Sequence, residues 1–203
     1  SCLKHLNRYP DRDAIALRRA LANSINASLG TDVNLSSIWA ANGSNEIIQT
    51  ILLAFDGGAL GFEPSYSMHP LISKVVGKKW ISIPRDENFE IGDPQIESAI
   101  SEIDAKIVFV TTPNNPTGTS TSLELISKLA TALTNRKGLV VVDEAYGEFS
   151  KNPSAITLIK SYPNVIVSRT MSKAFAFAGA RLGYLIADPK IIEALQLVRL
   201  PYH

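Results

Sequence analysis

Short apolar runs alternate with amphipathic stretches along the whole chain. Four runs are continuously apolar and of strand length, at residues 107–110, 139–142, 165–167 and 183–186. Shorter strand candidates lie at residues 59–62 and 80–83. Segments with helical periodicity span residues 15–25, 46–55, 71–76, 96–103, 123–133 and 191–198. This alternation is typical of βα units and strands buried on both faces, so it predicts an α/β fold with a mainly parallel sheet sandwiched by helices.

Length and composition favour one globular domain. The chain has 203 residues, 45% hydrophobic and 19% charged, which is ordinary for a folded domain. It shows no repeat, no low-complexity tract and no interdomain linker, so we expect a single domain over residues 1–203. Because the chain begins without Met and stops directly after a helical pattern, we also expect it to be part of a longer polypeptide.

The charge pattern favours a small-molecule partner. The formal net charge is +1 and the basic residues are dispersed, so we expect no nucleic-acid partner and no membrane partner. No apolar stretch is long enough to span a bilayer, and the first residues do not resemble a secretory signal, so we expect a cytoplasmic protein. Cys2 is the only cysteine and is interpreted as incidental. The histidines have no metal-ligand spacing, so we expect no metal site. His69, which follows Tyr66, could face the side chain of a substrate, but it is interpreted as packed or solvent-exposed.

Polar residues follow the first three long apolar runs. The first is followed by residues 111–118 (Thr-Thr-Pro-Asn-Asn-Pro-Thr-Gly), the second by residues 143–146 (Asp-Glu-Ala-Tyr) and the third by residues 168–173 (Ser-Arg-Thr-Met-Ser-Lys). Taken singly, each segment could be a turn, a helix cap or a solvated loop. In open α/β sheets, however, ligands bind beyond the carboxyl ends of the strands. The three segments together therefore predict one crevice that contains amide, carboxylate, phenol, hydroxyl and amine groups.

Seven motifs support a more specific interpretation. They are Arg-Tyr-Pro-Asp at 8–11, Asn-Gly-Ser-Asn-Glu at 42–46, Pro-Ser-Tyr at 64–66, Pro-Asn-Asn-Pro-Thr-Gly at 113–118, Val-Asp-Glu-Ala-Tyr at 142–146, Ser-Lys-Ala-Phe at 172–175 and Ala-Gly-Ala-Arg at 178–181. In order and spacing the chain resembles the fold-type I aminotransferases that use pyridoxal 5'-phosphate (PLP), and within them the histidinol-phosphate branch. The resemblance covers essentially the whole chain.

The resemblance implies a role for each residue around the cofactor ring. Lys173 holds PLP as a Schiff base and later moves a proton between the substrate α-carbon and the cofactor C4'. Asp143 pairs with the pyridinium nitrogen, so that the ring can accept electrons. Asn115 and Tyr146 hydrogen-bond the phenolic oxygen, and Tyr66 stacks on the ring.

The resemblance also implies a phosphate cup at a helix N-terminus. Its members are Gly43, Ser44, Asn45, Thr170, Ser172 and Arg181. Asn45 stands where relatives often carry an acid. Its backbone amide can still bind the phosphate, whereas the role of its side chain is not implied. For Arg181 a structural ion pair is the alternative. Glu144 and Glu148 are interpreted as scaffold or surface residues and not as catalytic acids.

Three expectations about assembly and geometry follow from the same resemblance. The Asn115–Pro116 peptide bond is predicted to be cis, which only X-Pro bonds commonly allow. A homodimer is predicted in which Tyr9 of one subunit reaches the cofactor phosphate of the other. The chain is expected to be a PLP-binding large domain without its N-terminal arm and C-terminal small domain, and therefore not to sustain efficient transamination alone.

The implied reaction is amino transfer between L-histidinol phosphate and 2-oxoglutarate in histidine biosynthesis. Neither composition nor periodicity selects this amino donor, so an aromatic amino-acid aminotransferase or a phosphothreonine-type PLP decarboxylase stays open on the same scaffold. A non-catalytic PLP-binding domain is a further alternative. A Rossmann-type nucleotide-binding domain is disfavoured, because no Gly-x-Gly-x-x-Gly motif follows a predicted strand.

Overall fold

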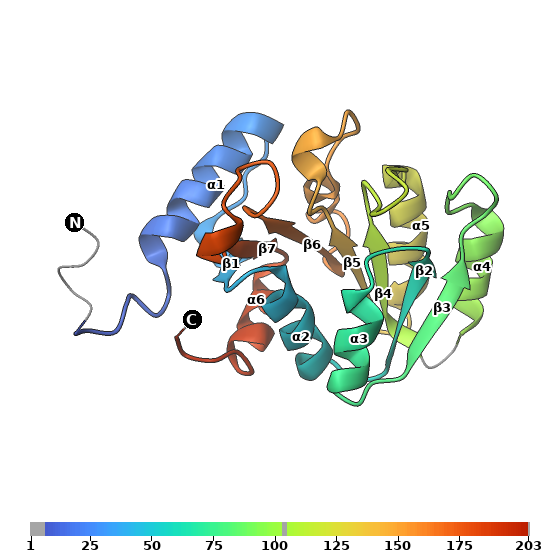
Figure 1. Ribbon diagram of the computed structural model, residues 1–203, viewed down its shortest axis with the longest axis horizontal. Helices are drawn as coiled ribbons and strands as arrows, with labels where there is room; N and C mark the ends of the chain where they lie inside the picture. Colours follow the sequence, from blue (N-terminus) through green and yellow to red (C-terminus); the bar gives the residue numbers. More distant parts are fainter. Residues whose placement is uncertain (1–6, 103–104, 203) are drawn as a thin grey trace.

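One mixed sheet forms the centre of the fold. The computed structural model describes residues 7–102 and 105–202, so that Cys2, His5 and His203 lie outside the described residues. Within these ranges, seven strands form a sheet in the order β1-β7-β6-β5-β4-β2-β3 (Figure 1). The strands are β1 (Ile38–Ala41), β2 (Gly58–Glu63), β3 (Trp80–Pro84), β4 (Ala105–Thr111), β5 (Leu139–Asp143), β6 (Val165–Thr170) and β7 (Gly183–Ile186). The predicted mainly parallel α/β fold is confirmed.

The strand pairing brings the three polar segments together. Strands β3, β2, β4, β5 and β6 run parallel, whereas β7 is antiparallel to both β6 and β1. In the register of the central strands, Thr111 pairs with Asp143 and Asp143 pairs with Ser168. The chain segments that follow β4, β5 and β6 therefore leave the sheet side by side at one edge, as predicted.

Helices cover both faces of the sheet (Figure 1). One face packs against α1, α4 and α5, and the other against α2, α3 and α6. Successive residues of β4 alternate between the two cores, with Val108 in the first and Phe109 in the second. No helix of the described residues is long and apolar enough to cross a membrane. The helices are α1 (Ile15–Leu29), α2 (Ser44–Ala54), α3 (Met68–Val75), α4 (Asp93–Ser101), α5 (Leu123–Thr134) and α6 (Pro189–Gln196).

The structure differs from the predicted elements mainly at short segments. Strand β1 was not predicted, because half of its four residues are alanine, which has low strand propensity. Helix α2 begins at Ser44, two residues before the apolar periodicity does. At α5 the predicted start is confirmed, since the Ser122 side chain caps the helix by accepting a hydrogen bond from the Leu125 amide. Short 3-10 turns join the other elements at Leu35–Ser37, Gly147–Phe149, Ala155–Leu158 and Ala178–Ala180.

An arginine is buried beside the edge strand β3 without an acidic partner among the described residues. Arg85 is 7% exposed, and its Nη1 donates to the Phe89 carbonyl at 3.2 Å. Its Nε and Nη2 are buried and have no hydrogen-bond partner in the described part of the chain. Burial lowers the pKa of Arg85 to about 10, although the nearby negative charge of Asp86 opposes the shift. The charged side chain therefore destabilises the fold.

We predict that Arg85→Met stabilises the protein. Each of the two buried donors without a partner costs about 1–3 kcal/mol, whereas the hydrogen bond to Phe89 that the substitution removes contributes about 1 kcal/mol. The free energy of unfolding, measured by denaturant titration, is expected to rise by about 2 kcal/mol. Arg19→Met at an exposed helix position is the matched control and is expected to be neutral. Equal effects of the two substitutions would contradict the prediction.

Candidate functional site

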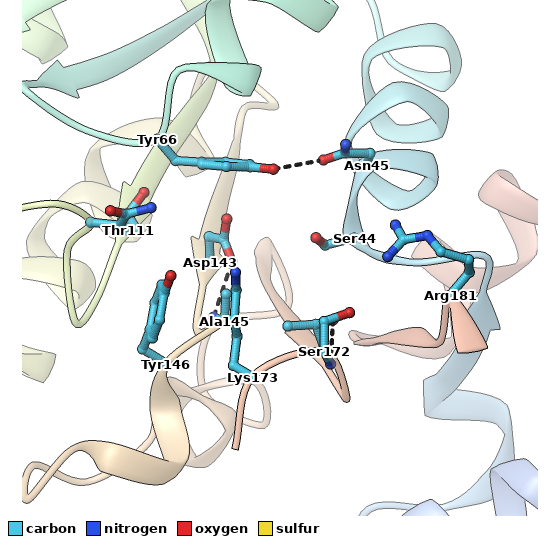
Figure 2. Close-up of a pocket in the computed structure, with 12 residues that line it drawn as sticks. Ser44, Asn45, Tyr66, Thr111, Asp143, Ala145, Tyr146, Ser172, Lys173 and Arg181 are labelled. Carbon is cyan, nitrogen blue, oxygen red and sulfur yellow. Dashed lines mark hydrogen bonds between the residues drawn. The ribbon is translucent and has the colours of Figure 1, made fainter. Parts of the chain in front are cut away.

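A pocket lies at the edge of the sheet where β4, β5 and β6 end (Figure 2). Its lining comes from these strand ends, the start of α2 and the loops after β2 and β6. All of the predicted site residues except Gly43 and Tyr9 line this pocket, and Thr111 and Ala145 join them without having been predicted. The lining residues are Ser44, Asn45, Tyr66, Thr111, Asn115, Asp143, Ala145, Tyr146, Thr170, Ser172, Lys173 and Arg181.

A buried carboxylate sits at the base of the pocket and is held by a histidine. Asp143 ends β5 and is 2% exposed, and its Oδ1 accepts a hydrogen bond from the Ala145 amide at 3.1 Å. Its Oδ2 lies 3.1 Å from Nε2 of His69 on α3. The His69 ring stacks on Phe109, with ring centroids 4.7 Å apart, and meets the edge of Tyr66. The interpretation of His69 as a packed residue is confirmed, but its contact with Asp143 was not foreseen.

Tyr66 spans the side of the pocket opposite Lys173 (Figure 2). Its hydroxyl donates a hydrogen bond to Oδ1 of Asn45 at 3.2 Å. Burial raises the pKa of Tyr66, and the negative charge of Asp143 raises it further. Tyr66 is therefore a neutral phenol near neutral pH. The contact gives the Asn45 side chain a defined position, which the sequence alone did not provide.

Two glycines allow the close contacts that form the positively charged end of the pocket. A Cβ atom on Gly43, whose φ is +83°, would lie 2.6 Å from Nη2 of Arg181. A Cβ atom on Gly183 would lie 2.6 Å from the Gly43 carbonyl carbon and 2.7 Å from the Ser44 nitrogen. Both positions therefore need glycine, and together they bring the Arg181 guanidinium to the N-terminus of α2. Free backbone N–H groups and a cation at one place form an anion-binding site.

Lys173 and Arg181 both come from the loop between β6 and β7. The loop leaves β6 with a turn in which Oγ1 of Thr170 accepts a hydrogen bond from the Ser172 amide at 3.1 Å. The Lys173 amine then points into the pocket, 5.4 Å from the centre of the Tyr146 ring (Figure 2). Arg181 donates from Nη1 to the Ala178 carbonyl. It forms no ion pair with any acid of the described residues, so its charge is available to a ligand.

The loop after β4 is held by an asparagine that was not assigned a role. Asn115 lines the pocket, and its peptide bond to Pro116 is cis, which confirms that prediction. The neighbouring Asn114 is 3% exposed and donates from Nδ2 to the Pro64 carbonyl and to the Thr117 hydroxyl. Its Oδ1 accepts a hydrogen bond from Ser65. Asn114 therefore ties the loop that carries Asn115 to the loop that carries Tyr66.

Tyr9, unlike Gly43, lies away from the groups that line the pocket. It is 80% exposed, and its ring stacks on Tyr202 with ring centroids 4.4 Å apart. Within one chain it contributes nothing to the lining. The described residues also contain no group of three or more His, Cys, Asp or Glu side chains that could hold a metal ion.

Comparison with known proteins shows which family the chain comes from. The sequence profile of the family "Aminotransferase class I and II" matches residues 3–203. The chain belongs to this family. It is similar to curated histidinol-phosphate aminotransferases, such as those of Thermobifida fusca and Mycolicibacterium vanbaalenii, with 56% and 55% identity over 98% of this chain. It spans 53% and 54% of their lengths, which is about half.

Solved structures of this family have the same fold. The histidinol-phosphate aminotransferase from Clostridium acetobutylicum superposes with a TM-score of 0.82 at 30% identity, over 98% of this chain and 58% of that one. A double mutant of Thermus thermophilus aspartate aminotransferase gives a TM-score of 0.83 at 23% identity, over 94% of this chain and 52% of that one. The second likeness concerns the fold alone.

We predict that the His69 contact with Asp143 stabilises this aminotransferase domain. His69→Phe keeps a ring against Phe109 but removes the nitrogen that pairs with the buried carboxylate. Leaving a buried polar group without its partner costs about 1–3 kcal/mol, and unfolding of the cofactor-free protein in urea is expected to show a loss of that size. His69→Gln retains an amide donor and is expected to recover part of it. Unchanged stability in His69→Phe would refute this role.

Proposed function

We propose that the chain is the cofactor-binding domain of a PLP-dependent aminotransferase that acts on L-histidinol phosphate and 2-oxoglutarate. The observation that carries the proposal is the order of charged groups in one pocket, with an anion-binding end, a central amine and a buried carboxylate. The high identity to proteins named histidinol-phosphate aminotransferase supports the choice of substrate. The proposed place of the reaction is histidine biosynthesis in the cytoplasm.

The charges and hydrogen-bonding groups of the pocket fit those of PLP. The cofactor has a phosphate at one end and a ring nitrogen at the other. The Arg181 guanidinium and the N-terminus of α2 would receive the phosphate, together with the hydroxyls of Ser44, Thr170 and Ser172 that line the same pocket. Asp143 would accept a hydrogen bond from the protonated ring nitrogen. With the phosphate at Arg181 and the ring nitrogen at Asp143, the cofactor would bind in one orientation.

The chemistry is divided between the cofactor and the chain. PLP, when bound, supplies a carbonyl that condenses with amines and a ring that accepts electrons released at the substrate α-carbon. The Lys173 amine would hold the cofactor and, once released by the substrate, would take the proton from the α-carbon and deliver it to the cofactor C4'. Asp143 would keep the ring nitrogen protonated, and His69 holds Asp143 in place.

Three further side chains would fix the position of the ring. Asn115 and Tyr146 line the pocket beside Lys173 and would hydrogen-bond the phenolic oxygen of the cofactor. Tyr66 would lie on the face of the ring, and its hydrogen bond to Asn45 keeps it in that place. These contacts would leave one face of the ring towards the Lys173 amine, which would move the proton on that side.

We predict that the intact protein, saturated with PLP, uses L-histidinol phosphate in preference to other amino donors. With 2-oxoglutarate as acceptor, kcat/KM is expected to exceed that for L-phenylalanine and L-tyrosine by about tenfold or more. The same preparation is also tested for decarboxylation of O-phospho-L-threonine. A higher kcat/KM with an aromatic amino acid, or decarboxylation as the main activity, would replace this proposal with the corresponding alternative.

Lys173→Ala is the control for this assay. It is expected to abolish amino transfer, and borohydride is expected to fix the cofactor on the Lys173 peptide of the wild-type protein. A wild-type protein that binds PLP at Lys173 but transfers no amino group would indicate a non-catalytic PLP-binding domain.

We further propose a homodimer in which Tyr9 completes the site of the partner subunit. In one chain the Tyr9 side chain is exposed and does not line its own pocket. A phenol hydroxyl buried at an interface needs a polar partner, and a cofactor phosphate would provide one. The rest of the protein is proposed to form a smaller domain that closes over the substrate, since this chain spans about half of its relatives.

We predict that two inactive variants complement each other if Tyr9 acts across the interface. In a mixed dimer of Tyr9→Ala and Lys173→Ala, one site contains both wild-type side chains and the other contains neither. Random re-pairing of equal amounts is expected to give about a quarter of the wild-type activity, since half of the dimers are mixed and each has one intact site. Activity no higher than the mean of the two parent variants would show that Tyr9 does not serve the partner subunit.

A further inference from the structure

A buried ion pair lies directly behind the pocket. Glu144 is 3% exposed and Arg169 is 9% exposed. Oε2 of Glu144 accepts hydrogen bonds from Nη2 of Arg169 at 2.7 Å and from its Nε at 3.0 Å. The two residues line a separate cavity between the end of α1 and the start of α5, and that cavity shares no lining residue with the pocket of Lys173. The interpretation of Glu144 as a scaffold residue is thereby confirmed.

The ion pair joins the two segments that carry the predicted catalytic groups. Glu144 follows Asp143 and precedes Tyr146 by two residues, whereas Arg169 precedes Thr170 and lies four residues before Lys173. The last backbone hydrogen bond between these segments runs from the Glu144 amide to the Ser168 carbonyl. Beyond this point the two segments diverge, so the side-chain contact takes over where the backbone pairing of β5 and β6 stops.

The Glu144 carboxylate also fixes the segment from residue 144 to residue 155, which contains Tyr146. Glu144 accepts a hydrogen bond from the Ser154 hydroxyl at 2.8 Å and another from the Ala155 amide at 2.7 Å. These contacts close the chain between residues 144 and 155 into a loop with fixed ends. Tyr146 lies inside that loop, so its position depends on the contacts of Glu144.

Arg169 is surrounded by groups that keep it charged. Its Nη1 lies 3.6 Å from a carboxylate oxygen of Glu148. Burial opposes the charge, but the negative charge of Glu144 and its hydrogen bonds outweigh this effect and raise the pKa of Arg169. For the adjacent Tyr184 on β7, in contrast, burial raises the pKa, and the positive charge of Arg169 acts against that shift. Removal of either Glu144 or Arg169 would leave an uncompensated buried charge and would destabilise the contact between the segments that follow β5 and β6.

We infer that Glu144 and Arg169 are positioning residues that set the separation between Tyr146 and Lys173 across the pocket. The inference rests on the proposed PLP site. Neither side chain faces the cofactor, so both act through the residues beside them. In wild type the Lys173 amine lies 5.4 Å from the centre of the Tyr146 ring. Because Tyr146 would contact the phenolic oxygen of the cofactor, a change in this separation alters the light absorption and pH response of bound PLP as well as turnover.

The experiment is a spectroscopic PLP titration of the intact protein with Glu144→Gln and with Arg169→Met. For each variant we expect the dissociation constant of PLP to rise about tenfold or more. The pH midpoint of the visible absorption change is expected to move by about half a unit or more. Ser154→Ala leaves both charges in place and removes one Glu144 contact. It is expected to give smaller changes in the same direction, and it serves as the test if the charge variants fail to fold.

Two controls separate positioning from general stability. Arg18→Met removes another buried arginine, one that donates to the carbonyls of Ile38 and Leu35 far from the pocket, so it should lower stability without changing the PLP spectrum. The double variant Glu144→Gln/Arg169→Met removes both charges and should regain stability while keeping the altered pH midpoint.

The inference is overturned if the Glu144 and Arg169 variants lose stability but match wild type in PLP affinity and pH midpoint, as Arg18→Met should. If wild type itself forms no borohydride-trapped adduct at Lys173, the proposed function fails and the positioning role fails with it. Altered spectra in the Glu144, Arg169 and Ser154 variants, with an unaltered spectrum in Arg18→Met, support the inference.

Discussion

The alternation of side chains at the ends of β5 and β6 is the constraint on which the site depends. Neighbouring residues of a strand point to opposite faces of the sheet. Asp143 therefore faces the pocket while Glu144 faces the other side, and Thr170 faces the pocket while Arg169 faces the other side. If β5 slipped by one residue, Asp143 and Glu144 would each point to the opposite face of the sheet. Which acid meets the ligand is thus decided by strand register.

The apolar part of β5 does little to fix this register. Its sequence is Leu-Val-Val-Val, so a slip by one residue would bury nearly the same apolar surface on each face. The polar end of β5 distinguishes the native register from a slipped one much better. Asp143 contacts His69 on one face of the sheet, and Glu144 contacts Arg169 on the other. In a slipped strand at least one buried carboxylate would lose its hydrogen-bond partner, at a cost of about 1–3 kcal/mol or more. The contacts that shape the pocket therefore also select the register.

The sequence predicted the strand ends well but not the contacts between distant elements. Continuous apolar runs followed by polar residues located β4, β5 and β6, because that signal lies within a few adjacent positions. The pairing of His69 with Asp143 joins residues 74 positions apart. It depends on which helix packs over which strand, and the helical segment predicted at residues 71–76 did not include His69, which lies in the first turn of α3. Asn114 and Asn115 illustrate the same limit, since only the packing of the loop shows which asparagine holds the loop and which lines the pocket.

The positions of the charged groups in the pocket limit which residues could recognise the amino donor in the proposed function. Arg181 at the anion-binding end and the carboxylate of Asp143 line one pocket, and the hydrogen bond between Tyr66 and Asn45 joins the loop after β2 to α2 beside them. In the proposed function every one of these groups is engaged by the cofactor, so none is free to recognise a substrate side chain. The fold is also shared with an aspartate aminotransferase at 23% identity. In the proposed function, selection of the amino donor would therefore arise from groups on the open side of the pocket, to which the proposed partner subunit and the proposed smaller domain would contribute.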